Sequence, residues 1–132
     1  MPVERKSVLI LDDDPEHLKI YGWLIEQAGF APVKCLVRRS GPVFDRDTAV
    51  DLVLLDYVLN CEVTTPEVAL TVRSLWPGIP MVLLSDIHGM PDNMASIVNC
   101  FVRKGEPAKL IAKITDMLGK AEAQPVGGEP RS

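Results

Sequence analysis

The sequence lacks the features that define several large classes of protein. It has three cysteines in 132 residues, Cys35, Cys61 and Cys100, and no Cys-x-x-Cys pair. We therefore expect free thiols rather than a disulfide framework or a zinc site. It also has no run of about 18 apolar residues, which a membrane-spanning helix needs. These absences predict a protein of the reducing cytoplasm with no membrane span.

A surplus of positive charge is missing as well. The 14 basic residues are outnumbered by 18 acidic ones, and the net charge is −4. Proteins that bind nucleic acid usually present a basic surface to the phosphates, so no nucleic-acid partner is expected. Residues 1–7 are charged and lead straight into an apolar run, which is unlike a signal peptide.

What the sequence does contain is a series of short apolar runs. They are continuous and rich in Val, Leu and Ile, as in parallel strands that helices cover on both faces. The runs are 8–11, 33–37, 52–55, 81–84 and 101–102. With crossover segments between them, they predict one α/β domain over residues 1–118, built on a doubly wound five-stranded parallel sheet. Residues 119–132 contain few apolar side chains and are predicted to form a disordered tail.

Helix signals are clear in three of the connecting segments, where a proline suits the first turn and an apolar stripe follows. These segments are 14–29, 65–78 and 107–118. The other two connections are less regular. Residues 38–50 contain a Gly-Pro pair and have room for only a short helix. Residues 86–99 are interrupted by a glycine and a proline, so a helix there is expected to begin near Asp92.

Polar residues follow four of the apolar runs, and the carboxyl ends of parallel strands form the edge where open α/β sheets bind ligands. These residues are Asp12, Asp13 and Asp14 after the first run, Asp56 after the third, Ser85 and Asp86 after the fourth, and Lys104 close to the end of the fifth. Clustered carboxylates repel one another unless a cation lies among them. Mg²⁺ suits such a set of oxygen ligands, and neither His17 nor His88 is expected to have a partner there.

The same groups fit phosphoryl transfer. A carboxylate can attack phosphorus and form an acyl phosphate. The charge on the equatorial oxygens is then neutralised by a metal ion and an ammonium group. A hydroxyl on a neighbouring strand can donate a hydrogen bond to a phosphoryl oxygen. The sequence offers a group for each of these roles: acids for the nucleophile and the metal, one lysine for the ammonium group and one serine for the hydroxyl.

Four motifs resemble those of bacterial response-regulator receivers, the CheY-like family. They are an opening strand with two acids at 8–15, a phospho-acceptor strand at 51–56, a strand ending in a hydroxyl at 82–85, and a strand with an aromatic residue before a lysine at 101–104. The resemblance covers residues 7–118. It implies a flavodoxin-like (βα)5 fold with strand order 2-1-3-4-5.

The resemblance also implies a role for each residue of the metal site. Asp56 is the phospho-acceptor. The Mg²⁺ ligands are the side chains of Asp13 and Asp56 and the backbone carbonyl of Val58. Asp12 acts on the ion through a bound water.

Three further residues are implied to bind or report the phosphoryl group. Lys104 pairs with the acceptor carboxylate at rest and with the phosphoryl oxygens afterwards. Ser85 turns toward the phosphoryl group, and Phe101 turns inward. The implied donor is a phosphohistidine on a sensor histidine kinase or a histidine phosphotransfer protein. A downstream protein then reads the changed surface.

The resemblance further implies a phospho-acceptor that catalyses only its own phosphorylation and dephosphorylation, rather than a turnover enzyme. We expect a single-domain regulator, which is a monomer or a phosphorylation-dependent dimer.

The chain departs from the family pattern at three places. Asp86 follows the switch hydroxyl, where a small residue is usual, so it is a candidate modulator of phosphorylation or of its lifetime. Gly105 replaces a proline that is often cis, and we expect a trans bond because a non-proline cis bond costs about 2.5–4 kcal/mol. Residues 59–61 replace a Met-Pro loop.

Two other functions remain open from the residues alone. A phosphatase of the haloacid-dehalogenase type also has Asp-x-Asp after its first strand, and Asp12 would then be the nucleophile. A receiver-like interaction module would keep the fold and never take phosphate. A flavodoxin is disfavoured because the acidic first loop would repel a flavin phosphate.

Overall fold

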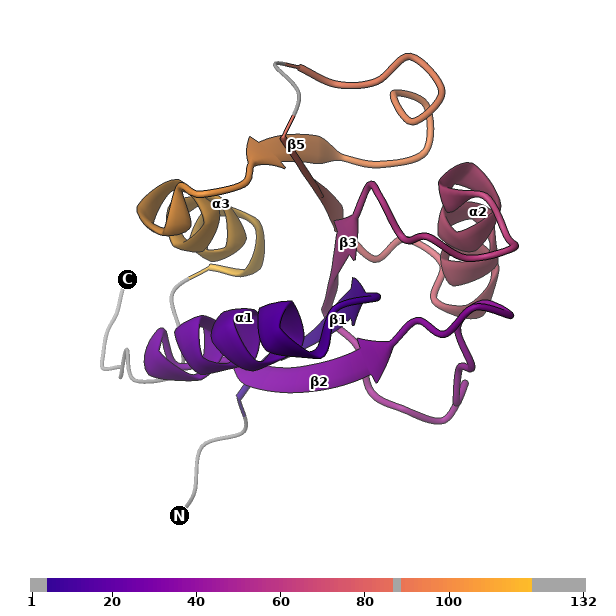
Figure 1. Cartoon of the computed structure of the whole chain (residues 1–132). Helices are drawn as coiled ribbons and strands as arrows, with labels where there is room; N and C mark the ends of the chain where they lie inside the picture. The colour runs from indigo at the N-terminus through magenta and orange to yellow at the C-terminus, as the bar shows by residue number, and fades with distance from the viewer. Residues whose placement is uncertain (1–4, 87–88, 120–132) are drawn as a thin grey trace.

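The structure, a computed structural model, describes residues 5–86 and 89–119. Almost all of the predicted tail therefore lies outside the described residues. The strands are β1 (Ser7–Asp12), β2 (Ala31–Leu36), β3 (Leu52–Asp56), β4 (Met81–Ser85) and β5 (Cys100–Arg103). They form one parallel sheet in the order β2-β1-β3-β4-β5 (Figure 1). The predicted five-stranded sheet and its strand order are confirmed.

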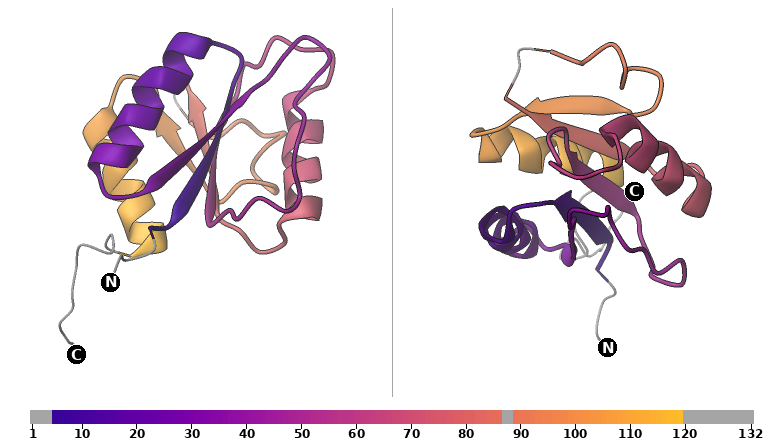
Figure 2. Two further views of the ribbon diagram at one scale, coloured as in Figure 1. Left: turned by 90° about the horizontal axis from the view of Figure 1, so that it is seen from below. Right: turned by 45° about the vertical axis from the view of Figure 1, so that its right-hand side comes forward.

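Helices lie on both faces of this sheet. They are α1 (Pro15–Gln27), α2 (Thr65–Leu75) and α3 (Pro107–Leu118). The first and third cover one face and the second covers the other (Figure 2). Each has a proline in its first turn, and Asp14 caps α1 by accepting a hydrogen bond from the Glu16 amide at 2.9 Å. None of the helices in the described ranges is long and apolar enough to cross a membrane.

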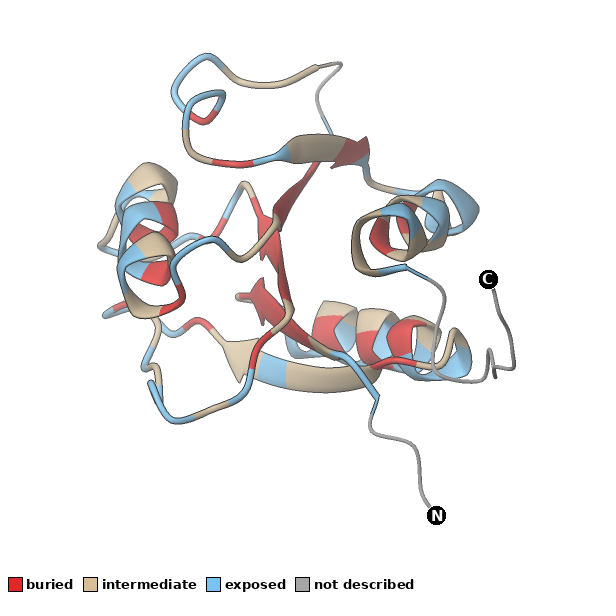
Figure 3. Cartoon of the chain, turned by 180° about the vertical axis from the view of Figure 1, so that it is seen from behind, coloured by how far each residue is buried: buried red, intermediate tan, exposed pale blue. Residues whose placement is uncertain are grey.

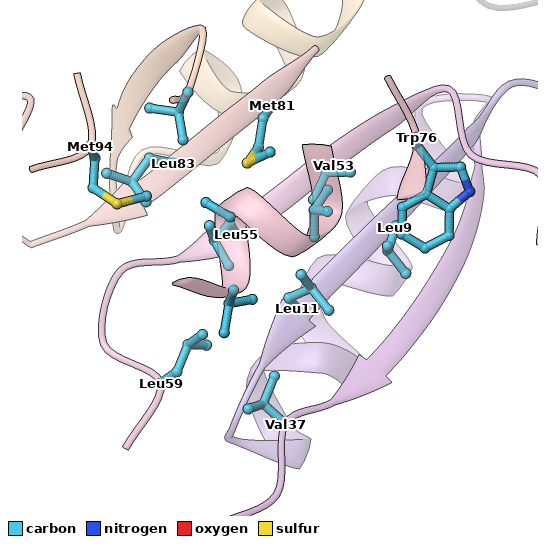
Figure 4. Close-up of a cluster of buried hydrophobic side chains, with 14 of the residues drawn as sticks. Leu9, Leu11, Val37, Val53, Leu55, Leu59, Trp76, Met81, Leu83 and Met94 are labelled. Atoms are coloured by element: carbon cyan, nitrogen blue, oxygen red, sulfur yellow. The ribbon is translucent and has the colours of Figure 1, made fainter. Parts of the chain in front are cut away.

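The central strands are buried on both sides, which explains their uninterrupted apolar sequence. The central strands are coloured as buried in Figure 3. Alternate residues of these strands enter two separate clusters. Leu9 and Leu11 of β1 point toward α2, into the cluster drawn in Figure 4, whereas Val8 and Ile10 point toward α1 and α3. This two-sided packing fixes the strand ends rigidly at one edge of the sheet.

The second connection, between β2 and β3, contains no helix, although its length leaves room for a short one. Residues 37–51, all of which the structure describes, form turns and an isolated bridge that ends at Gly41. Gly41 has a φ of +111°, and a Cβ there would lie 3.0 Å from Val63, so the turn needs glycine. Phe44 covers the sheet instead. Its ring packs edge-to-face against Trp76, with the two ring centroids 5.7 Å apart.

The fourth connection likewise lacks the predicted helix near Asp92. In its described part, residues 86 and 89–99, the backbone forms bends and turns only. Met94 donates its amide to the Pro91 carbonyl at 3.0 Å, and its side chain is fully buried on the sheet. The apolar stripe after Pro91 (Met94, Ile97 and Val98) spans little more than one turn before β5 begins at Cys100, which is too short for a stable helix. The (βα)5 repeat is thus incomplete in the two connections.

Candidate functional site

Three polar side chains are buried in the part of the chain that the structure describes, and all three end neighbouring strands. Asp12 ends β1, Asp56 ends β3 and Ser85 ends β4, and their exposed fractions are 1%, 2% and 2%. Burial of charged groups is costly unless they are paired. The prediction that these residues converge at the carboxyl edge of the sheet is confirmed.

Lys104, which follows β5, neutralises Asp56. Its Nζ lies 3.0 Å from Asp56 Oδ1 and 3.1 Å from Oδ2, so the predicted resting pair is present. The Val58 amide donates to the same carboxylate at 3.1 Å. Burial alone would lower the pKa of Lys104. The hydrogen bond to Asp56 and the charges of Asp56, Asp12 and Asp86 outweigh it and raise that pKa, so the ammonium is retained.

Asp12 has no comparable cation pair. Its Oδ1 accepts a hydrogen bond from the Asp14 amide at 2.9 Å. Burial, together with the charge of Asp56, nevertheless raises the pKa of Asp12 to about 6. Two buried acids thus lie close together, and the Lys104 ammonium contacts only one of them, Asp56. This is the electrostatic arrangement that a bound divalent cation relieves, and the buried oxygens are ligands of the type that Mg²⁺ takes.

His17 also belongs to this site, contrary to the sequence-based expectation that it has no partner. Its Nδ1 lies 3.3 Å from Asp12 Oδ2, and its Nε2 lies 3.5 Å from Asp14 Oδ2. One ligand atom each from Asp12, His17 and Asp56 fall within 4.8 Å of one another. A side chain in the first turn of a helix leans back toward the helix start, here toward the end of β1. That geometry was the available signal for finding His17 from the sequence.

Asp13 is held differently from Asp12. It is half-buried, and its Oδ2 accepts a hydrogen bond from Asn60 Nδ2 at 2.9 Å. Asn60 has a φ of +49°, in the left-handed region that non-glycine residues rarely occupy. Asp13 does not belong to the group of possible ligands formed by Asp12, His17 and Asp56. Asn60 was missed from the sequence because its partner lies 47 residues away.

The remaining predicted residues lie around the same edge. The Ser85 carbonyl accepts the Lys104 amide at 2.9 Å, and Phe101 is half-buried on β5 beside Leu83. Asp86 is exposed directly after Ser85. These positions leave the switch roles of Ser85 and Phe101 as predictions.

The backbone after Lys104 is also consistent with the sequence. Gly105 has a φ of +85°, and the described residues contain no cis peptide bond. The expectation of a trans bond at this position is confirmed.

Response-regulator receivers are among the solved structures that share the fold of this chain. A CheY-like receiver domain from Methanospirillum hungatei JF-1 is 19% identical in sequence to this chain. The match covers 87% of this chain and 94% of that domain, with a TM-score of 0.71. The chemotaxis protein CheY4 of Vibrio cholerae is 16% identical, with coverage of 86% and 98% and a TM-score of 0.69. A two-component response regulator from Clostridium difficile is 16% identical, with coverage of 86% and 96% and a TM-score of 0.68.

No protein-family model matches the chain, and no curated protein matches it in sequence. The structural likeness therefore carries the assignment of the fold, which is the CheY-like receiver fold. Function has to be argued from the site itself.

Proposed function

We propose that this chain is a response-regulator receiver that accepts a phosphoryl group on Asp56 from a phosphohistidine. The observation that carries the proposal is the environment of Asp56. Its carboxylate is buried at the end of β3, contacts the Lys104 ammonium and lies beside Asp12, on a receiver fold. A buried, cation-paired carboxylate at the ligand-binding edge of the sheet is suited to nucleophilic attack on phosphorus.

The positions of these groups support the following transfer. A carboxylate oxygen of Asp56 attacks phosphorus while the bond from phosphorus to the donor imidazole nitrogen breaks. The bonding pair stays on that nitrogen, which takes up a proton. The Lys104 ammonium, already within 3.1 Å of both carboxylate oxygens, moves to the oxygens of the phosphoryl group. The Ser85 hydroxyl donates to another phosphoryl oxygen, and Phe101 fills the space that Ser85 leaves.

The acids provide the binding site for Mg²⁺. We assign Asp13, Asp56 and the Val58 carbonyl as direct ligands, and Asp12 as a ligand through water. When bound, Mg²⁺ neutralises charge that develops on the equatorial phosphoryl oxygens. The fit of the site to a cation rests on the buried, mutually repelling pair of Asp12 and Asp56.

Phosphorylation then changes what the protein binds. The new charge shifts a pre-existing equilibrium of the surface around β4 and β5. The donor is a sensor histidine kinase or a histidine phosphotransfer protein, and a second protein reads the shifted state. The protein acts in the cytoplasm, as a monomer or as a dimer formed on phosphorylation.

Asp12 is less suited than Asp56 to be the nucleophile. Burial and the neighbouring charge raise the pKa of Asp12 to about 6, so its surroundings destabilise its anion. The Lys104 ammonium contacts Asp56 instead. Both observations weigh against a phosphatase of the haloacid-dehalogenase type.

The test is Mg²⁺-dependent labelling with acetyl phosphate, with the modified residue mapped by mass spectrometry. We expect one phosphoryl group, on Asp56, and none when Mg²⁺ is removed with a chelator. A label on Asp12 would establish the dehalogenase-type alternative. No label from acetyl phosphate or from a phosphohistidine donor would leave a receiver-like interaction module.

A further inference from the structure

The imidazole of His17 presents an unused ligand atom to the acidic site. Its side chain is 40% exposed, yet Nδ1 itself is buried and makes no hydrogen bond to any described residue. This nitrogen lies 3.3 Å from Asp12 Oδ2, but the contact lacks hydrogen-bond geometry. A buried polar atom without a hydrogen bond is costly and calls for a partner.

The surrounding atoms identify that partner as a cation. His17 Nδ1 and one oxygen each of Asp12 and Asp56 lie within 4.8 Å of one another. Side-chain rotations that draw these atoms together would place all three about 2.0–2.2 Å from one ion. Two carboxylates and one imidazole form a three-ligand set of the kind that divalent ions take in proteins, and one coordination position is left for water.

We propose that His17 is a nitrogen ligand of this site, so that the protein binds Zn²⁺ or a similar imidazole-binding ion in competition with Mg²⁺. The proposal rests on the cation site proposed above and adds its ion preference. Mg²⁺ takes oxygen ligands, whereas imidazole favours Zn²⁺ and its neighbours. The ligand set Asp12, His17 and Asp56 therefore shifts selectivity away from Mg²⁺, relative to a site built from oxygen alone.

The first test compares two affinities in the full chain by isothermal titration calorimetry, with ZnCl₂ and MgCl₂ as probes. His17→Ala is expected to weaken Zn²⁺ binding by about tenfold or more. It should change Mg²⁺ binding by less than about twofold. His17→Gln, which keeps a side chain of similar size, should behave like His17→Ala. The matched control is His88→Ala, which removes the only other histidine and should leave both affinities unchanged.

The second test needs no variant. In protein labelled with ¹⁵N-histidine, Zn²⁺ should shift the His17 Nδ1 resonance strongly and Nε2 only weakly, and Mg²⁺ should shift neither to that extent. An unshifted Nδ1 resonance would overturn the proposal. So would a loss of Zn²⁺ affinity in His88→Ala and not in His17→Ala.

These outcomes are separable from the proposed phosphorylation. Mg²⁺-dependent labelling of Asp56 is measured in the same His17→Ala sample. If labelling persists while Zn²⁺ affinity is unchanged from wild type, the ion preference is wrong and the acceptor function stands. If wild type shows the Nδ1 shift but no label, the ion preference stands and the acceptor function is wrong.

Discussion

The Lys104 ammonium contacts both oxygens of the Asp56 carboxylate, at 3.0 Å and 3.1 Å. The pair bridges the loop after β5 and the end of β3, across the intervening strand β4. Asp56 is 2% exposed and the Lys104 side chain is 16% exposed, so water screens the pair weakly. The carboxylate that we propose as the phospho-acceptor therefore already has a cation against it in the unphosphorylated protein.

Replacing Lys104 should destabilise the protein through the acid that it leaves behind. In Lys104→Met, Asp56 stays buried without its cation, and we expect the free energy of unfolding to fall by about 1–3 kcal/mol. Urea denaturation measures this loss. Adding Asp56→Asn to Lys104→Met removes the stranded charge and should recover part of it. A double variant no more stable than Lys104→Met would show that the charge of Asp56 is not the cause.

Replacing Asp12 should have the opposite effect on the metal-free protein. Because the pKa of Asp12 is raised from 3.8 to about 6, its ionised form opposes folding. Asp12→Asn should raise the free energy of unfolding at neutral pH by an amount on the order of 1–3 kcal/mol. The matched control is Asp47→Asn, at an exposed acid, with all proteins in a chelator.

The raised pKa of Asp12 also determines how the free energy of unfolding changes with pH. Between pH 3.8 and about 6 the folded state holds more protons on Asp12 than the unfolded state does. The contribution of Asp12 to the free energy of unfolding therefore falls as pH rises through this window. Subtracting the Asp12→Asn curve from the wild-type curve should isolate this fall. Parallel curves would contradict the raised pKa.

Asn60 should act on metal binding through Asp13. Its amide donates to Asp13 Oδ2 at 2.9 Å from a left-handed backbone. Asn60→Gly keeps that backbone accessible and removes the amide, so we expect Mg²⁺ affinity to fall about tenfold with little loss of stability. Asn60→Ala should add a loss of about 1 kcal/mol in stability. Unchanged Mg²⁺ affinity in both variants would remove Asp13 from the ligand set.

Asp86 should slow the arrival of a phosphoryl group. It is exposed next to Ser85, and its charge reaches Lys104. Asp86→Ala is expected to speed phosphorylation by acetyl phosphate about two- to fivefold at low salt, and less at high salt. The matched control is Asp116→Ala, at an exposed acid near the far end of α3. Equal rates and equal acyl-phosphate half-lives in wild type and Asp86→Ala would exclude a role for Asp86.

The strands and the main acids could be predicted from the sequence because both follow from local patterns. Continuous apolar runs give buried parallel strands, and the residues that end them must meet at one edge. Asp12, Asp56 and Ser85 needed no further information to be placed together. Lys104 likewise follows from its position just after the last strand.

Other features could not be predicted because they depend on contacts distant in sequence. Val63 leaves little room for a Cβ at Gly41, and Asn60 donates a hydrogen bond to Asp13. In their described residues, the second and fourth connections form no helix. Each is a short segment that packs on the sheet through individual side chains, among them Phe44 in the second and Met94 in the fourth. His17 is an intermediate case, since helix geometry points it toward the site but only the packed structure shows its buried Nδ1.

The most direct test of the acceptor assignment compares phosphoryl incorporation in wild type, Asp56→Asn and Asp12→Asn, with acetyl phosphate, excess Mg²⁺ and intact-mass detection. We predict one phosphoryl group on wild type, none on Asp56→Asn, and slower but detectable incorporation on Asp12→Asn. Full incorporation on Asp56→Asn, in protein shown to be folded, would contradict the account.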